Sequence, residues 1–360
     1  MTAETDALLT IQDLVRWGGC QFADARLFFG HGTDNEFDEA AWLVAHALHL
    51  PLERVESYRD CHITVGERAA VLALLRRRIT ERRPAAYLTG LAWFAGLEFI
   101  VDDTVLIPRS PLAELIADGF APWVNPEGIR RVLDLCTGSG CLGIALAAYL
   151  PDVRVDLADI SPAALRVAAR NRTLHGLDER VRIIESDLFA SIEQACASPS
   201  RTRPTGFVAD PNLRQRPSPD LERERTMDFG LHPDPDPEAN PDPHWEQVYD
   251  IIVSNPPYVG VEEMESLPAE YLHEPRLALA AGETGLDLVL RILRDAPDYL
   301  DDEGVLIVEV GSTAATLQRR FPDVPFTWLD FERGGEGVLL LSREQLVEYH
   351  PRFSEAVADL

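Results

Sequence analysis

Segment 131–150, RVLDLCTGSGCLGIALAAYL, holds a short apolar run, a glycine-containing turn and a second apolar run. Residues 131–135 have the composition of a buried strand, and residues 142–150 are apolar over the length of a short helix. Gly138 and Gly140 allow the backbone between strand and helix to turn tightly and to approach a ligand closely. Because the free N–H groups of a helix N-terminus attract polar and anionic groups, this segment predicts a ligand-binding site.

Strands and helices alternate along the chain from residue 130 onward. This alternation predicts an α/β fold, with a mostly parallel sheet that is covered by helices on both faces. Two apolar segments near the C-terminus flank a glycine-rich turn, which predicts an antiparallel hairpin that closes the sheet. The predicted strands are 131–135, 153–158, 181–185, 249–254 and 305–310, the closing hairpin is 326–331 with 338–341, and the predicted helices are 142–150 and 162–175.

The first part of the chain has a different character, because apolar side chains recur there at helical spacing. We therefore predict a small helical domain that ends near Pro84. Beyond it the period changes to alternation, which predicts a linker β-hairpin folded around Asp102 and Asp103. The predicted divisions are a helical domain over residues 1–85, the linker hairpin over 86–110 and the α/β domain over 111–360.

Residues 191–246 interrupt the alternation of strands and helices. They hold ten of the 26 prolines of the chain, and apolar residues are sparse among them. Such a composition buries too little apolar surface to offset the entropy lost on ordering, which predicts a disordered insertion in a surface loop. A partner-docking arm is the functional alternative, and the sequence leaves the role of this insertion open.

The charge balance limits the classes of partner. The chain has 360 residues with 33 basic and 60 acidic side chains, giving a net charge of −27, and all 33 basic residues are arginine. Binding to a phosphate backbone needs clustered positive charge, so we predict no direct sequence-specific binding to nucleic acid. The excess of acid favours a basic protein partner through long-range electrostatic steering.

The sequence predicts neither a metal site nor contact with a membrane. Its five cysteines include no C-x-x-C pair, which argues against a zinc site or a disulfide framework. The N-terminus lacks a basic stretch, and no apolar run approaches about 18 residues. A signal peptide and a membrane span are therefore not predicted, and we expect a cytoplasmic protein with reduced thiols.

Acidic residues also stand at the ends of the second and third predicted strands. Asp159 ends the second strand, where a carboxylate can accept both hydroxyls of a ribose. Asp187 follows the third strand and can accept an adenine amino group, with Leu188 and Phe189 beside the base. Cys136 stands where a dinucleotide-binding motif has its first glycine, and the chain has no Walker lysine. S-adenosylmethionine therefore fits better than NAD or ATP, because acids suit its cationic ammonium and sulfonium groups.

The predicted strand 249–254 ends abruptly at Asn-Pro-Pro-Tyr. Two consecutive prolines make this backbone stiff, which suits a segment that must hold a flat group in place. The Asn255 side-chain oxygen and the Pro256 backbone carbonyl can each accept one N–H of a planar NH₂ group, and Tyr258 can lie against its flat face. We therefore predict Asn255, Pro256 and Tyr258 as catalytic residues, and Asn255, Pro256, Pro257 and Tyr258 as the substrate-binding segment.

Several segments together resemble a known family. They are DLCTGSGCLGIAL (134–146), DISPAAL (159–165), SDLF (186–189), IIVSNPPYV (251–259), EPRLALAAGETGLDL (274–288) and LIVEVG (306–311). This set resembles the protein-glutamine N5-methyltransferases, which have the Rossmann-like fold of class I S-adenosylmethionine-dependent methyltransferases. Residues 108–116, PRSPLAELI, resemble the branch that methylates a glutamine of large-subunit ribosomal protein number three more than the branch that modifies peptide release factors.

The resemblance implies transfer of a methyl group from S-adenosylmethionine to the side-chain amide nitrogen of a glutamine in a basic ribosomal protein. It also implies that the N-terminal helices recognise the substrate and that residues 255–258 contact the acceptor glutamine. From the resemblance and the strand-end acids, the predicted cofactor-binding residues are Cys136, Thr137, Gly138, Ser139, Gly140, Asp159, Asp187, Leu188 and Asn255.

Two other classes of function are compatible with parts of the pattern. A methyltransferase acting on an exocyclic amine of DNA or RNA also presents a planar NH₂ group, after flipping the base. The candidates for its basic patch are the clusters 76–78 and 82–83, which contain only arginine. A catalytically idle module would bind the cofactor and transfer nothing. The charge distribution distinguishes the nucleic-acid methyltransferase from the protein methyltransferase. A methyl-transfer assay distinguishes the idle module from an active enzyme.

Overall fold

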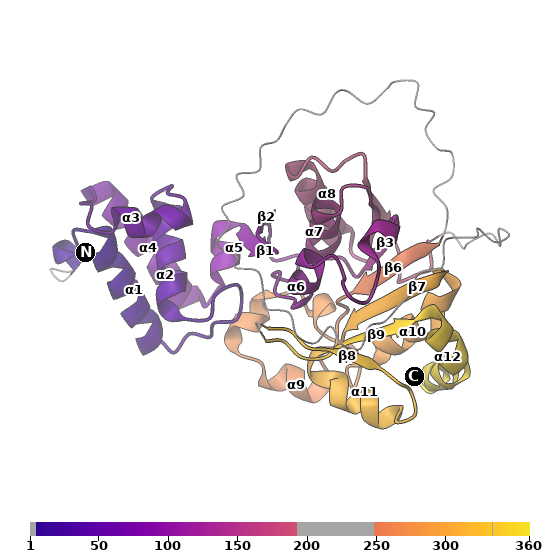
Figure 1. The fold of residues 1–360 in the computed structure, drawn as a ribbon. Helices are drawn as coiled ribbons and strands as arrows, with labels where there is room; N and C mark the ends of the chain where they lie inside the picture. Colours follow the sequence, from indigo (N-terminus) through magenta and orange to yellow (C-terminus); the bar gives the residue numbers. More distant parts are fainter. Residues whose placement is uncertain (1–4, 193–247, 333) are drawn as a thin grey trace, which may run out of the picture.

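The computed structural model describes residues 5–192, 248–332 and 334–360. A helical N-terminal part lies beside a larger α/β part, and a two-stranded hairpin stands between them (Figure 1). The insertion predicted for residues 191–246 lies outside the described residues, apart from its first two positions. In the described ranges, no helix combines the length and the apolar character needed to cross a membrane.

The α/β part is built on a seven-stranded sheet with the order β5-β4-β3-β6-β7-β9-β8. Strands β3 to β7 are parallel to one another, whereas β9 runs antiparallel to both β7 and β8. The predicted mostly parallel sheet with a closing antiparallel hairpin is thereby confirmed. The strands are β3 Arg131–Leu135, β4 Arg154–Asp159, β5 Val181–Glu185, β6 Tyr249–Ser254, β7 Leu300–Glu309, β8 Thr327–Leu329 and β9 Val338–Ser342.

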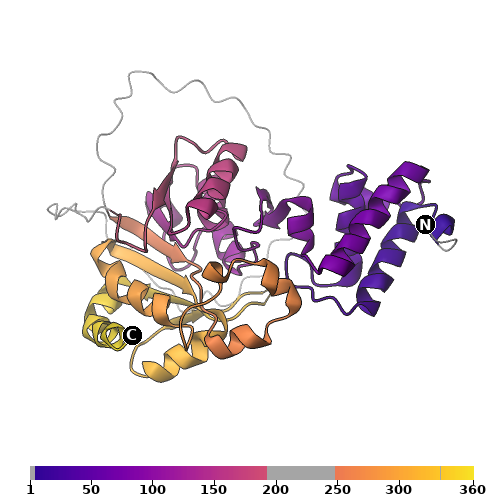
Figure 2. The same cartoon turned by 180° about the vertical axis from the view of Figure 1, so that it is seen from behind.

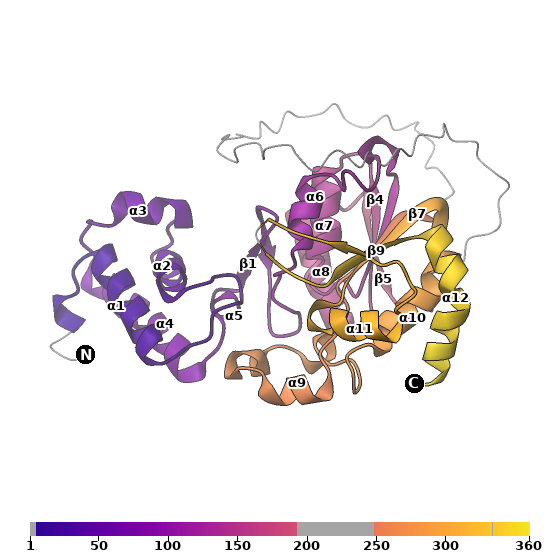
Figure 3. The ribbon, with the colours of Figure 1, turned by 60° about the horizontal axis from the view of Figure 1, so that its bottom comes forward.

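Helices cover both faces of this sheet (Figure 3). On β6, Ile251 and Val253 pack into the core that contains α7, whereas Ile252 packs into the core that contains α10 and α12. Because both faces are buried, the central strands β6 and β7 have consecutive apolar residues, at 251–253 and 305–308, instead of strict alternation with polar residues. The helices of this part are α6 Leu112–Ala117, α7 Cys141–Tyr149, α8 Pro162–Leu174, α9 Val261–Ser266, α10 Asp287–Asp295, α11 Ala314–Arg320 and α12 Arg343–Ala358.

The N-terminal part is a helical bundle, as predicted from its apolar spacing. Thr10 and Thr64 each form a capping box at the start of a helix, which fixes where α1 and α4 begin. Helix α5 starts directly after Pro84, so helical structure continues a short way past the predicted end at residue 85. The helices are α1 Ile11–Asp24, α2 Glu36–Ala47, α3 Val55–Tyr58, α4 Val65–Glu81 and α5 Ala85–Thr89.

The linker hairpin is present, but its turn is not where the sequence predicted it. Strands β1 Leu91–Phe94 and β2 Leu97–Ile100 are joined by Ala95 and Gly96, with φ values of 48° and 74°. Two positive φ angles match the twist of a tight hairpin turn, and glycine accepts such an angle without strain. The hairpin predicted around residues 102–103 is therefore wrong. A turn does lie there, with the Val105 N–H bonded to the Asp102 carbonyl at 3.2 Å, but it joins no strands, and residues 101–110 run on as a connection toward the sheet.

Candidate active site

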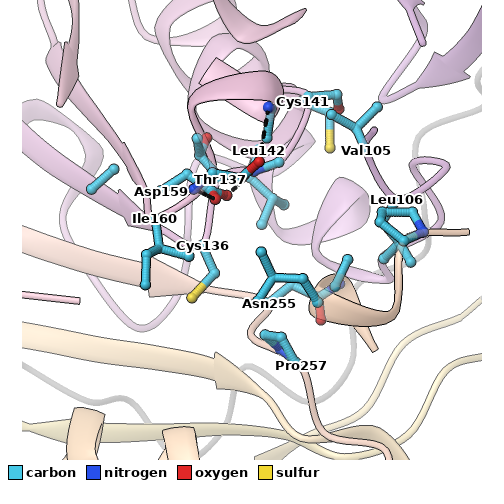
Figure 4. Close-up of a pocket in the computed structure, with 18 of the residues that line it drawn as sticks. Val105, Leu106, Cys136, Thr137, Cys141, Leu142, Asp159, Ile160, Asn255 and Pro257 are labelled. Atoms are coloured by element: carbon cyan, nitrogen blue, oxygen red, sulfur yellow. Dashed lines mark hydrogen bonds between the residues drawn. The ribbon is translucent and has the colours of Figure 1, made fainter. Parts of the chain in front are cut away.

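A pocket lies at the carboxyl ends of β3, β4 and β6, the edge of a parallel sheet where ligands bind. Most residues that the sequence singled out as cofactor-binding line this one pocket (Figure 4). They come from separate strand ends, so the parallel sheet unites side chains that are distant in the sequence. The lining includes Cys136, Thr137, Gly138, Ser139, Asp159, Asp187, Leu188 and Asn255.

The glycine loop, residues 136–140, follows its tight path because three of its residues have left-handed backbone angles. Cys136, Gly138 and Gly140 have φ values of 58°, 57° and 84°, a region that glycine enters freely and other residues rarely. Gly140 is absent from the pocket lining, and a Cβ there would lie 2.8 Å from Ile144 Cδ1. Glycine is favoured at this position mainly by its φ of 84°, because Gly140 is the N-cap of α7, while the other loop residues line the pocket.

Asp134, on β3, holds the glycine loop in place through hydrogen bonds. Its Oδ2 accepts hydrogen bonds from Thr137 Oγ1 at 2.6 Å and from the Gly143 N–H at 2.9 Å. Burial raises the pKa of Asp134 to about 7, although both hydrogen bonds act in the opposite direction. This carboxylate ties the loop to the first turn of α7, and it lies outside the pocket lining itself.

Asp159 faces the glycine loop from the end of β4. Its Oδ2 accepts from the Gly138 N–H at 2.9 Å, and its Oδ1 accepts from the Ser161 N–H at 2.8 Å. Burial raises the pKa of Asp159, and these backbone hydrogen bonds oppose that rise. Each carboxylate oxygen can accept more than one hydrogen bond. Asp159 thus fixes the loop and keeps acceptor capacity for hydroxyl groups in the pocket that it lines.

Both arginines among the described lining residues are paired with carboxylates. Arg291 donates a hydrogen bond to Asp187 Oδ1 at 2.9 Å, and Arg109 donates to Glu274 Oε2 at 2.7 Å. Neither guanidinium is therefore available as an unpaired positive charge to bind a phosphate group. The pocket suits a neutral or cationic ligand better than a nucleoside diphosphate, as the sequence predicted from its acids. Asp187 has one oxygen already engaged, which leaves the other for a ligand.

The Asn-Pro-Pro-Tyr segment follows β6 directly at the pocket. Asn255 and Pro257 line the pocket, whereas Pro256 and Tyr258 are not among the lining residues. The Tyr258 hydroxyl donates to Glu309 Oε1 at 3.2 Å, and a Cβ on Gly311 would lie 2.5 Å from its ring. The structure therefore brings Asn255 to the glycine loop, while the predicted stacking of Tyr258 on the acceptor group stays a prediction.

Two walls of the pocket were not found from the sequence. The connection 104–110 after the hairpin forms one, and Pro275, Leu277 and Ala278 form another. Figure 4 shows Val105 and Leu106 across the pocket from the strand β4 residues. Neither wall carries a strand-end acid or a glycine turn, which were the signals used. Glu309 was also missed, because the predicted strand ran to Val310 and so did not end in an acid, whereas the observed strand β7 ends at Glu309.

The wall 275–278 is fixed by buried ion pairs to other parts of the chain. Glu274 accepts from Arg109 and from the Ile107 N–H at 3.2 Å. Burial alone would raise the pKa of Glu274, but the His31 ring, 3.7 Å from Oε2, and the hydrogen bonds from Arg109 outweigh it and lower the pKa to about 2. The carboxylate therefore stays ionised and joins the two walls that the sequence did not predict.

A second buried carboxylate on the same segment reaches the N-terminal helices. Glu270 pairs with Arg82 at 2.8 Å and with Arg78 at 3.7 Å, and it accepts from the Phe28 N–H at 3.1 Å. Figure 2 shows the region of α9 and the chain after it beside the N-terminal helices. The helical part therefore contributes to the position of one pocket wall.

Comparison with known proteins gives full-length matches. Residues 120–197 match the model of the methyltransferase small domain, and residues 13–90 match that of the PrmC N-terminal domain. A ribosomal protein uL3 glutamine methyltransferase of Xylella fastidiosa strain Temecula1 is 43% identical over 357 residues, which is 99% of this chain and 97% of that protein. A protein of the same name from Neisseria meningitidis serogroup B is 42% identical over 341 residues, 94% of this chain and 95% of that protein.

These matches bear directly on the resemblance seen in the sequence. The identity extends over nearly the whole chain, well beyond the glycine loop and the Asn-Pro-Pro-Tyr segment. Enzymes of this kind use S-adenosylmethionine as methyl donor, which agrees with a pocket that has no spare cation among its described lining residues. The resemblance is confirmed, and this chain belongs to the family of ribosomal protein uL3 glutamine methyltransferases.

Proposed function

We propose that this protein transfers a methyl group from S-adenosylmethionine to the side-chain amide nitrogen (N5) of a glutamine in ribosomal protein uL3. One observation carries the proposal beyond family membership: Asn255 and Pro257 line the same pocket as the glycine loop. A group held by the Asn-Pro-Pro-Tyr segment is thereby brought to the ligand held by the loop. The substrate is a ribosomal protein, so we place the reaction in the cytoplasm.

The residues present fit S-adenosylmethionine, which when bound supplies a methyl group on a positively charged sulfur. Residues 136–139, with their backbone N–H groups and small side chains, would hold its amino-acid part. Asp159 has the acceptor capacity for the two ribose hydroxyls. Asp187 and Leu188 line the same pocket and would hold the adenine, and Leu188 is itself buried. These assignments follow from the donors, acceptors and apolar surface that the pocket offers.

The acceptor amide is a poor nucleophile because its nitrogen lone pair is delocalised onto the neighbouring carbonyl. The Asn255 side-chain oxygen and the Pro256 backbone carbonyl each accept one of its two N–H groups. This fixes the nitrogen, turns its lone pair toward the methyl group and pushes electron density onto it. Positioning of this kind can lower the activation free energy of a bimolecular reaction by about 7–11 kcal/mol. One N–H proton leaves to solvent as the new N–C bond is completed, so no strong general base is required.

The experiment that tests this function compares uL3 from cells with and without the gene for this protein. We expect intact uL3 from the deletion strain to be lighter by one methyl group, with the difference confined to a peptide containing a glutamine. Complementation with the wild-type gene restores the mass. Complementation with an Asn255→Ala variant is the matched control and leaves uL3 unmethylated. An unchanged uL3 mass in the deletion strain would refute the proposed substrate.

We propose that the substrate is recognised as a basic protein, since the chain carries a net charge of −27. Long-range attraction accelerates encounter and is screened by salt. We expect kcat/KM for uL3 to fall about tenfold between low and moderately high ionic strength, with kcat at saturating uL3 little changed. Steady-state kinetics over a salt series measures both quantities. A flat kcat/KM profile would contradict steering.

The divisions predicted from the sequence fit this proposal. We assign residues 1–85 to substrate recognition, residues 86–110 to the linker and residues 111–360 to catalysis. Support comes from the ion pairs of Arg78 and Arg82 with Glu270, which join the helical part to the segment just before the wall 275–278.

Methylation of a nucleic acid is the alternative that the arginine clusters raise. Most of these arginines are engaged within the protein, so little positive charge remains for a phosphate backbone. Full-length likeness to uL3 methyltransferases also favours the ribosomal substrate over a release factor. The pairs are Arg77 with Glu81, Arg78 with Glu39, Arg82 with Glu270 and Arg83 with Asp103.

A further inference from the structure

Glu309 is a buried carboxylate beside the Asn-Pro-Pro-Tyr segment. The reaction described above gives this carboxylate no role. It ends β7, and only 6% of its surface is exposed. Strands β6 and β7 are parallel, with Ser254 opposite Val308. Asn255 directly follows Ser254 and Glu309 directly follows Val308, so the two residues are neighbours at the carboxyl ends of these strands.

Four side chains surround this carboxylate. The Ser110 hydroxyl donates to Oε2, and the Tyr258 hydroxyl donates to Oε1 at 3.2 Å. Asn255 is a neighbour of Glu309 as well, because the residues before them, Ser254 and Val308, are paired in the sheet, and the Arg109 guanidinium is close enough to interact electrostatically. Burial raises the pKa of Glu309, and these neighbours oppose that rise because each stabilises the ionised form. A buried group with so many donors around it is held in one geometry.

The chemistry of the pair dictates which end of Asn255 faces Glu309. Both oxygens of Glu309 already accept hydrogen bonds from hydroxyl groups, so the carboxylate presents acceptors, whereas a carboxamide has a donor end, NH₂, and an acceptor end, C=O. Asn255 can therefore hydrogen-bond Glu309 only through its nitrogen. The carbonyl end is then turned away from Glu309. Asn255 lines the pocket, so its oxygen is the end left for the substrate.

We propose that Glu309 is a positioning residue that sets the orientation of the Asn255 carboxamide, so that its oxygen and not its nitrogen meets the acceptor amide. The inference rests on the proposed function, because orientation matters only if the acceptor is an NH₂ group. A rotated Asn255 would point its own N–H groups at the substrate nitrogen. That arrangement removes an acceptor and places donor against donor. Glu309 thus selects the productive orientation without touching the substrate.

The direct test is Glu309→Gln, which keeps size and shape but adds a donor. The introduced carboxamide can hydrogen-bond the Asn255 oxygen and hold the Asn255 side chain in the wrong orientation. We expect kcat to fall about a hundredfold, in the range seen when one aligned hydrogen-bonding group is lost from an active site. The Kd for S-adenosylmethionine, measured by calorimetry, and the KM for uL3 should stay within about threefold. The melting temperature of each variant reports folding.

Ser110→Ala is the matched control, because it removes a donor from the same carboxylate and keeps the negative charge. The loss of one hydrogen bond between a neutral donor and this site is expected to cost about fivefold in kcat. A purely structural role for Glu309 would make the two substitutions similar. A clearly larger loss of kcat in Glu309→Gln than in Ser110→Ala would therefore show that Glu309 orients Asn255 and does not only stabilise the surrounding structure.

A paired substitution supplies a rescue that only the orientation proposal predicts. Asn255→Asp alone puts two carboxylates side by side, and we expect it to be nearly inactive. In the double variant Asn255→Asp with Glu309→Gln, the new amide can donate to the new carboxylate, whose second oxygen again accepts from the substrate. We expect kcat of the double variant to exceed that of Asn255→Asp at least about tenfold. This comparison does not require that Glu309→Gln folds alone.

The outcomes separate the two proposals. If wild-type protein does not methylate uL3, the proposed function fails. If wild-type protein is active, a Glu309→Gln variant that folds with kcat within about threefold of wild type overturns the orientation proposal. So does a double variant no more active than Asn255→Asp. A large loss in Glu309→Gln together with rescue in the double variant supports it.

Discussion

Replacing Asn255 by alanine is expected to lower kcat for methyl transfer about a thousandfold, with much weaker effects on cofactor binding. The substitution removes a side-chain acceptor for the acceptor amide, and loss of one such aligned group costs about 10²–10³ in kcat. The second acceptor, the Pro256 carbonyl, is also less constrained once its neighbour is truncated. The glycine loop and Asp159 are unchanged, so S-adenosylmethionine should still bind within about tenfold of the wild-type Kd.

Calorimetry and a methyl-transfer assay on uL3 measure the two quantities on the same preparation. Asn125→Ala is a suitable control, because Asn125 is exposed and its side chain only caps a short 3₁₀ turn outside the pocket lining. It should retain wild-type kcat. Near-wild-type turnover in Asn255→Ala would show that Asn255 does not hold the acceptor, and the proposed mechanism would have to be abandoned.

Replacing Arg78 by alanine is expected to destabilise the folded protein by about 3–5 kcal/mol, the usual cost of breaking a buried ion pair from one side. The Arg78 side chain is fully buried on α4. It donates to Glu39 Oε1 at 2.6 Å and to the Phe28 carbonyl at 3.0 Å, and it lies 3.7 Å from Glu270. Without the guanidinium, two buried carboxylates lose a counter-charge.

Denaturant unfolding followed by circular dichroism measures this effect, with Arg77→Ala as the control. Arg77 is the neighbouring residue, its side chain is 53% exposed, and it pairs with Glu81 one helical turn away. An exposed pair of this kind contributes about 0.5 kcal/mol or less. Equal effects of the two substitutions would mean that burial of the Arg78 cluster adds nothing to stability.

Local pattern accounts for the regular elements of this protein. The predicted strands at 131–135, 181–185 and 249–254 match β3, β5 and β6 to the residue, because each is a compact apolar run bounded by polar or turn residues. The hairpin shows the limit of such reasoning. Alternation continues through residues 94–107 on both sides of two candidate turns, and the backbone angles at Ala95 and Gly96 decide between them.

The candidate site divides in the same way. Most predicted site residues stand at the carboxyl ends of strands, and a parallel sheet brings these ends together at one edge. They are residues 136–139, Asp159, Asp187 and Asn255. Glu309 obeys this rule too, but its role depends on hydrogen bonds to Ser110 and Tyr258, which no local pattern records.

The sequence by itself determined the sheet, the glycine loop and the placement of Asn255 beside it, because these depend on short-range periodicity and on the topology of parallel strands. Only the tertiary structure decided which segments close the pocket. The contact between Arg109 and Glu274 spans 165 positions, and that between Arg78 and Glu39 is fully buried. Such pairings depend on how separate elements pack. The sequence offers many carboxylates as a partner for each arginine, and only the packing of the folded chain brings one of them into contact.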